Sequence, residues 1–174
     1  PYNLLRRSLD SLCRQTCDDF EAVLIDDGSP DDCGAICDEY AANDNRFVVI
    51  HQENQGLSQA RNAGLDIASG TYVSFIDSDD AISPHFLQSL VSALENENAD
   101  IAECSRLDIY DNTLPHFEAI PYTIRGYDRD AAFSLLVPNS STWHSFKIPF
   151  FSSCIARFNP VCPPIPGTIA SGRS

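Results

Sequence analysis

Residues 20–30 read FEAVLIDDGSP, an apolar run that ends in two aspartates, a glycine and a Ser-Pro pair. A continuous apolar run of this length is typical of a strand that is buried on both faces of a sheet. Ser29 can cap a following helix, with Pro30 at its first position and Asp32 in its first turn. The stretch therefore predicts a strand, a tight turn and a helix that runs to about residue 42.

The alternation of helix and strand continues on both sides of this stretch. The apolar periodicity and the turn residues predict helices over residues 3–16, 58–68 and 83–97, and strands over residues 20–26, 46–51, 71–76 and 99–104. Beyond these, weaker patterns indicate strands near 106–111 and 119–124 and a short helix near 128–136. Ser83 and Pro84 repeat the helix start of Ser29 and Pro30. The order predicts an α/β fold with a mostly parallel sheet flanked by helices.

The composition changes sharply near the end of the 174-residue chain. Residues 131–174 contain no Asp or Glu, whereas the preceding part holds all 25. We therefore interpret residues 1–137 as a partial domain and residues 138–174 as an irregular Pro- and Ser-rich tail, either disordered or non-native. A tail recruited for binding is an alternative. The chain begins at Pro1 without a methionine, so we also expect an upstream piece.

The net charge of −14 argues against a nucleic-acid partner, because phosphate contacts need a basic surface. It does not argue against a nucleotide ligand, since carboxylates hold a diphosphate through a divalent cation. No apolar run reaches the roughly 18–20 residues of a membrane span.

Seven cysteines, an odd number in no compact secreted framework, indicate reduced thiols in a cytosolic setting. Cys13 with Cys17 and Cys33 with Cys37 have the same spacing, and four thiolates can bind zinc. The spacing is looser than that of common zinc motifs, and we prefer small cysteines packed on helix faces.

Acidic residues follow two of the predicted strands. Asp26 and Asp27 end one strand, and residues 77–80 (DSDD) end another. Ligands of open parallel sheets bind outside the carboxyl ends of the strands. Grouped carboxylates repel one another unless a cation relieves them, which favours Mg²⁺ or Mn²⁺. The alternative is that each cluster only forms a turn or a helix cap, but two clusters at one sheet edge favour a binding site.

Residues 15–31 (QTCDDFEAVLIDDGSPD) and 54–80 (NQGLSQARNAGLDIASGTYVSFIDSDD) closely resemble the family-2 glycosyltransferases of GT-A fold. The similarity runs from about Ser8 to about Leu107. It implies an inverting enzyme that transfers a sugar from a nucleotide diphosphate, most often UDP, to an acceptor hydroxyl. It also implies a Mn²⁺ or Mg²⁺ cofactor and identifies residues 1–137 as part of a nucleotide-sugar-binding domain.

The resemblance further implies the role of each matching residue. Asp27 matches the acceptor of a hydrogen bond from the nucleotide base. Asp77 and Asp79 match the family's DxD motif, in which the first residue faces the ribose or sugar and the second coordinates the metal. Arg61 matches a basic position facing the nucleotide, with a surface ion pair as the alternative.

Three further positions match less directly. Asn54 and Gly56 match a loop whose backbone approaches the ligand, where a glycine avoids a Cβ clash. Tyr2 is a candidate remnant of a tyrosine that packs near the base, although it lies closer to Gln15 than the family's spacing implies.

The family's general base is an Asp or Glu downstream of the DxD motif, and this chain has none after Asp130. The catalytic base is therefore unknown, and a truncated, non-catalytic nucleotide-sugar-binding module is the alternative function. The kinship implies a saccharide or lipid-linked saccharide acceptor in bacterial surface polysaccharide synthesis. It places the protein in the cytoplasm, with a peripheral position at the inner face of the membrane as an option.

Two other classes fit the residues less well. A phosphoryl-receiving signalling domain also has paired aspartates after a strand, but it needs a lysine on a later strand. The chain's single lysine, Lys147, falls in the irregular segment. A dinucleotide oxidoreductase is disfavoured because no G-x-G-x-x-G follows any predicted strand.

Overall fold

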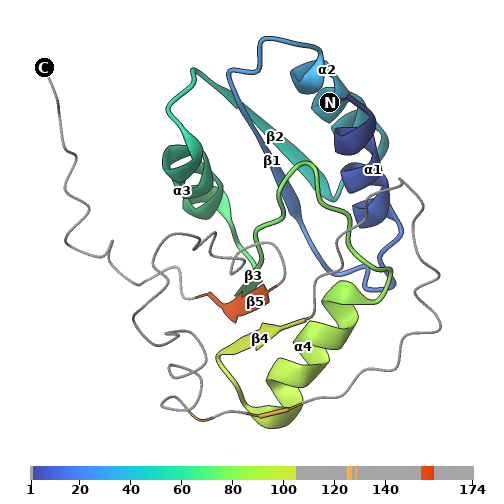
Figure 1. The fold of residues 1–174 in the computed structure, drawn as a ribbon, viewed down its shortest axis with the longest axis vertical. Helices are drawn as coiled ribbons and strands as arrows, with labels where there is room; N and C mark the ends of the chain where they lie inside the picture. Colours follow the sequence, from blue (N-terminus) through green and yellow to red (C-terminus); the bar gives the residue numbers. More distant parts are fainter. Residues whose placement is uncertain (1, 105–124, 127, 129–153, 159–174) are drawn as a thin grey trace, which may run out of the picture.

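The computed structural model describes residues 2–104, 125–126, 128 and 154–158, to which all structural statements apply. Its helices are α1 (Tyr2–Cys13), α2 (Cys33–Asn43), α3 (Leu57–Ile67) and α4 (Phe86–Glu97). Its strands are β1 (Ala22–Asp27), β2 (Phe47–Gln52), β3 (Tyr72–Val73), β4 (Ile101–Glu103) and β5 (Cys154–Arg157). Figure 1 shows α2 and α3 on either side of the β1–β2 pair and α4 beside β4.

The strands form two small sheets. β1 and β2 pair in parallel, with Ala22 opposite Phe47 and Asp27 opposite Gln52, so the predicted parallel unit is confirmed. The other sheet has the order β3-β5-β4, and β5 runs antiparallel to both neighbours. β3 and β4 are therefore parallel to each other, with α4 as the connection between them. The expectation of a mostly parallel sheet holds for β1–β2 but not for the hydrogen-bonded pairs of the second sheet.

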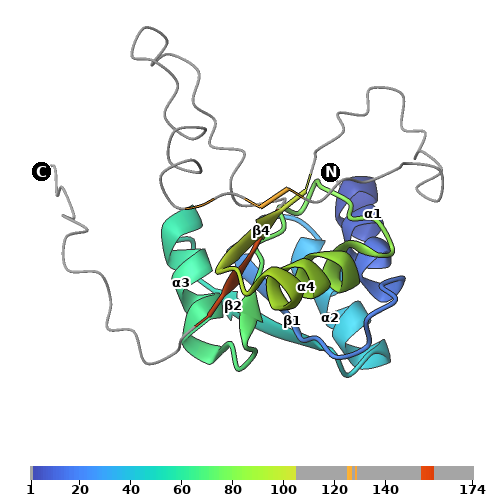
Figure 2. The ribbon, with the colours of Figure 1, turned by 90° about the horizontal axis from the view of Figure 1, so that it is seen from below.

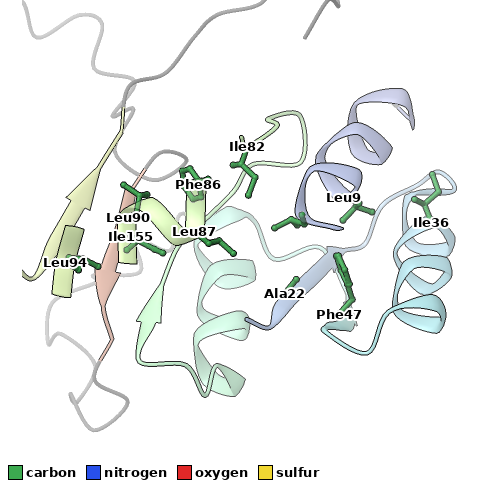
Figure 3. Close-up of a cluster of buried hydrophobic side chains, with 11 residues drawn as sticks. Leu9, Ala22, Ile36, Phe47, Ile82, Phe86, Leu87, Leu90, Leu94 and Ile155 are labelled. Carbon is green, nitrogen blue, oxygen red and sulfur yellow. The ribbon is translucent and has the colours of Figure 1, made fainter. Parts of the chain in front are cut away.

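One apolar cluster joins the elements of both sheets (Figure 3). Leu9 of α1, Ala22 of β1 and Phe47 of β2 pack in it, and Leu94 of α4 is completely buried. Ile155 brings β5 into the same cluster. Burial of these side chains is the main stabilising term for such a fold.

The predicted starts of two helices are wrong. α2 begins at Cys33, with Asp32 at the cap position, and Ser29 lies in the turn after β1, where its amide donates to Asp26 Oδ1 (3.0 Å). α4 begins at Phe86, whose amide donates to the Ser83 carbonyl (3.0 Å). In both places the residues of the Ser-Pro pair form the preceding turn.

The predicted irregular tail includes one strand. Cys154–Arg157 lies within residues 138–174, yet it forms β5, the central strand of its sheet. Four residues are too few for a period to be recognised, and their pairing partners lie more than fifty residues away. The strands expected near 106–111 and 119–124 lie outside the described residues, as does the helix near 128–136 apart from Asp128, which is in no regular element.

Candidate nucleotide-sugar site

The turn after β1 is shaped by a glycine. Gly28 has φ +70°, a left-handed conformation that glycine adopts without a steric penalty. A Cβ at this position would lie 2.8 Å from the backbone nitrogen of Asn54. The loop before α3 therefore packs directly on this turn, and the predicted loop residue Asn54 lies beside Asp27.

The carboxylate of Asp27 is held by three donors. Its Oδ1 accepts hydrogen bonds from the Gln55 amide (2.9 Å) and from Gln52 Nε2 (2.7 Å). Its Oδ2 accepts one from the Gly56 amide (2.8 Å). These bonds, the Gln55 amide first, lower the pKa of Asp27. A carboxylate has about four acceptor positions, so one remains for a further donor.

Gly56 joins this arrangement to α3. It precedes Leu57 with φ +85°, and its amide is the one that reaches Asp27 Oδ2. The negative charge of Asp27 thus lies at the amino end of α3, where the helix dipole favours an anion. The structure brings together Asp27, Asn54 and Gly56, three of the predicted site residues.

The second acidic cluster forms a turn after β3. The Asp80 amide donates to the Asp77 carbonyl (3.0 Å), and both Asp77 and Asp79 are exposed. Arg61 of α3 donates from Nη2 to Asp77 Oδ1 (3.2 Å), and its guanidinium lies 5.5 Å from the centre of the Phe75 ring. The ion pair that was the alternative for Arg61 is therefore present.

The residues form two groups, one at Asp27 and one at Asp77. Within residues 2–104 and the shorter described pieces, no three His, Cys, Asp or Glu side chains are arranged to hold a metal ion by themselves. Two exposed carboxylates, Asp77 and Asp79, are nevertheless hard oxygen donors of the kind Mg²⁺ and Mn²⁺ prefer. These ions are often bound by one or two carboxylates plus substrate phosphates. The donor set therefore fits a metal that arrives with a diphosphate. Tyr2 is the first residue of α1.

The sequence did not predict a hydrogen-bonded chain of three side chains next to Asp27, formed by Asp26, His51 and Asp38. His51 of β2 contacts Asp26 Oδ2 through Nδ1 (2.9 Å) and Asp38 Oδ1 through Nε2 (3.0 Å). A Cβ at Gly34 would lie 2.6 Å from Asp26 Oδ2, so this glycine makes room for the pair. Asp26 and then Asp38 raise the pKa of His51. Only the β1–β2 register, in which Asp26 is opposite His51, could have indicated this contact from sequence.

The cysteines do not form a zinc site among the described residues. Burial raises the pKa of Cys37 to about 11, and a hydrogen bond with Asp31 is the main cause of a similar rise for Cys33. Both thiols stay protonated at neutral pH.

None of the helices in the described part of the chain has the length and apolar character needed to cross a bilayer.

Sequence comparison identifies relatives of the region that contains both groups. The chain is 46% identical over 106 residues to the uncharacterized glycosyltransferase EpsJ of Bacillus subtilis, covering 59% of this chain and 31% of that protein. It is 47% identical over 100 residues to the glycosyltransferase GlyA of Streptococcus pneumoniae, covering 58% of this chain and 14% of that protein. The chain thus spans less than a third of the length of these relatives.

Solved structures share the fold. TarS of S. aureus, residues 1–349 in complex with UDP-GlcNAc, superimposes with a TM-score of 0.58 at 27% identity. The match covers 66% of this chain and 34% of TarS. The mannosyltransferase PcManGT of Pyrobaculum calidifontis, solved with GDP-Man and Mn²⁺, has a TM-score of 0.56 at 22% identity, covering 62% and 33% of the two chains. This second likeness concerns the fold alone.

The family model described as glycosyl transferase family 2 matches residues 2–157, which is most of the chain and includes both acidic turns and β5. The α/β architecture and the relatives agree with this match. The chain belongs to glycosyl transferase family 2.

Proposed function

We propose that this chain binds the donor in an inverting glycosyltransferase that moves a sugar from a nucleotide diphosphate, UDP in the first instance, to an acceptor hydroxyl. The observation that carries the proposal is the Asp27 carboxylate. Its position is set by Gln52, Gln55 and Gly56, and it keeps an acceptor position at the carboxyl end of β1. A uracil ring offers one imide N–H, which this acceptor suits. The binding of UDP-GlcNAc by TarS supports the same choice.

The proposed roles of Asp77, Asp79 and Arg61 follow from their charges. Asp79, with Asp77, would hold Mn²⁺ or Mg²⁺, which when bound neutralises the diphosphate as it leaves. Arg61 pairs with Asp77 in the described structure, and in this proposal it exchanges that partner for a diphosphate oxygen. The Asn54–Gly56 loop packs on Gly28, so its backbone stays close to the nucleotide. The protein contributes position and charge compensation.

Transfer also needs a base that removes the proton of the acceptor hydroxyl. That base stays unassigned, because the sequence has no Asp or Glu after Asp130. The same observation favours a second candidate function, a module that binds the nucleotide sugar without transferring it. Hydrolysis of the sugar nucleotide by this chain, at a rate above the background, would exclude that candidate. The acceptor we propose is a saccharide or lipid-linked saccharide of the bacterial surface, glycosylated at the cytoplasmic side of the membrane.

Calorimetric titration with UDP, with and without Mn²⁺, tests the donor site. We expect binding that needs Mn²⁺ and that weakens at least about tenfold in Asp79→Ala, a loss of about 1.4 kcal/mol. Asp66→Ala is the matched control, because Asp66 is an exposed aspartate on α3. Equal affinity of Asp79→Ala and the unaltered chain would remove Asp79 from the metal site. Absence of UDP binding by the unaltered chain would contradict the donor proposal.

A further inference from the structure

A stripe of polar residues lies on α1 and on the two residues that follow it. This stripe contacts the chain segment that leads from the acidic turn of residues 77–80 to the start of α4. Arg7, Ser11 and Gln15 are spaced by four residues, which places them on one helix face. Their contacts are Arg7 Nη2 to the Asp79 carbonyl (3.2 Å), the Ile82 amide to Ser11 Oγ (3.1 Å), Gln15 Nε2 to the Ser83 carbonyl (2.7 Å) and the Leu87 amide to Gln15 Oε1 (3.1 Å). The order of the partners follows the order of the stripe, so α1 contacts this segment along its length.

Arg7 differs from the other two members of the stripe. Ser11 and Gln15 are buried, and their polar atoms are paired. The Nε atom of Arg7 is buried but has no hydrogen-bond partner among the described residues. A buried donor without a partner lowers stability, so folding alone does not favour an arginine here. Its recorded hydrogen bond goes to the acidic turn, the segment that carries Asp79.

The turn is held from two sides. Arg61 of α3 contacts the side chain of Asp77, and Arg7 of α1 contacts the main chain at Asp79. Three carboxylates within four residues repel one another, and an adjacent guanidinium offsets part of that repulsion. A hydrogen bond to the Asp79 carbonyl leaves the Asp79 carboxylate available while it restrains the backbone that carries it.

We propose that Arg7 is a positioning residue for the acidic turn of residues 77–80, which it fixes through the Asp79 carbonyl. A fixed backbone at Asp79 sets the direction of its Cα–Cβ bond and thereby limits where the Asp79 carboxylate can lie. The consequence for metal binding rests on the proposed donor function. The consequence for the turn itself does not, and it can be measured without a ligand.

Amide hydrogen exchange tests the effect on the turn. The Asp80 amide, bonded to the Asp77 carbonyl, reports whether the turn is closed. We expect its exchange to accelerate about tenfold in Arg7→Met, while the Leu90 amide inside α4 keeps its rate and the melting temperature stays equal or rises. Arg7→Lys, which keeps the charge and a donor, should restore part of the protection. Unchanged Asp80 exchange in Arg7→Met would overturn the proposal.

Arg6→Met is the matched control. Arg6 is the neighbouring arginine on α1, but it pairs with Glu39 of α2 (2.6 Å), and among the described residues it makes no hydrogen bond to the turn. We expect Asp80 exchange in Arg6→Met to equal that of the unaltered chain. If both variants accelerated it equally, the effect would come from lost charge on α1 and the proposal would fail.

Titration with UDP and Mn²⁺ tests the consequence for the site. We expect Arg7→Met to weaken the Mn²⁺-dependent binding about tenfold, with Arg6→Met unchanged. Faster Asp80 exchange with unaltered affinity would overturn the link from the turn to metal binding. If the unaltered chain bound no UDP, the donor proposal would fail, whereas the exchange measurement would still decide the role of Arg7 in the turn.

Discussion

At the scale of single residues, two neighbouring aspartates of β1 serve different purposes because a strand alternates its faces. Asp26 contacts His51 and the Ser29 amide, next to α2. Asp27 contacts Gln55 and Gly56, next to α3. The pKa of each carboxyl is lowered, that of Asp26 mainly by Ser29 and that of Asp27 mainly by Gln55. One pair of adjacent carboxylates therefore supports both the packing of α2 and the candidate nucleotide site.

The His51 contacts predict a pH dependence of stability. A histidine whose pKa is raised in the folded protein adds stability that is fully present below its ordinary pKa of 6.5 and is lost as the pH rises through the higher folded value. Asp26 has a lowered pKa, so its contribution is constant in this range and is lost only in acid. The melting temperature of the unaltered chain, relative to that of His51→Gln, should therefore fall as the pH rises above about 6.5.

Thermal unfolding of the two proteins across this range measures the difference. Asp38→Asn removes one of the two carboxylates beside His51 and should give an intermediate slope. A melting temperature of the unaltered chain that rose with pH relative to His51→Gln would contradict the assignment.

At the scale of elements, α4 begins without a side-chain cap of its own. His85 occupies the cap position and makes no capping hydrogen bond. Gln15, which follows α1, supplies the missing acceptor at the Leu87 amide (3.1 Å) and donates to the Ser83 carbonyl. This contact spans 72 residues, so the start of α4 depends on a residue that is distant in the sequence.

Gln15→Met should destabilise the protein. Methionine matches the length of glutamine, but it leaves the buried Leu87 amide and the Ser83 carbonyl without these partners. The free energy of unfolding should fall by about 1–3 kcal/mol for each group left unpaired. Denaturant unfolding measures the change. Gln88→Met on the exposed face of α4 is the control, expected to stay within about 0.5 kcal/mol.

At the scale of the whole molecule, the chain returns after residue 153 to place β5 between β3 and β4. The Arg157 amide donates to the Asp100 carbonyl (2.9 Å), and the Phe158 amide donates to the Thr71 carbonyl (2.7 Å). Figure 2 shows β5 beside β4 and α4, and Ile155 packs in the common core. The second sheet is complete only when this distant segment joins it.

Ile155→Ala should therefore lower the free energy of unfolding by about 2–5 kcal/mol, the usual cost of truncating a buried isoleucine. Ile155 is 3% exposed, whereas Ile101 on the neighbouring β4 is 56% exposed. Ile101→Ala is therefore the matched control, and it should change stability little. Equal stability of the two variants in urea would show that β5 does not contribute to the fold.

The sequence alone determined the features that depend on neighbours along the chain. The apolar patterns and turn residues predicted the positions of α1 to α4 and of β1 and β2 in the described part of the chain, with ends that differ by a few residues. The motifs around Asp27 and the DSDD turn identified the family that the comparisons confirm. The roles of Asp27, Arg61, Asp77 and Asp79 toward a nucleotide sugar, and the division at residue 137, stay predictions.

Only the tertiary structure decided the features that depend on partners far along the chain. The Ser29 cap was wrong, since Asp32 holds the cap position of α2 and Ser29 lies in the turn bound by Asp26, and the start of α4 depends on Gln15. β5 was missed because its hydrogen bonds go to strands that precede it by more than fifty residues. A local pattern reports the propensity of a segment, whereas a buried polar group or a short strand acquires its partner only when distant segments meet.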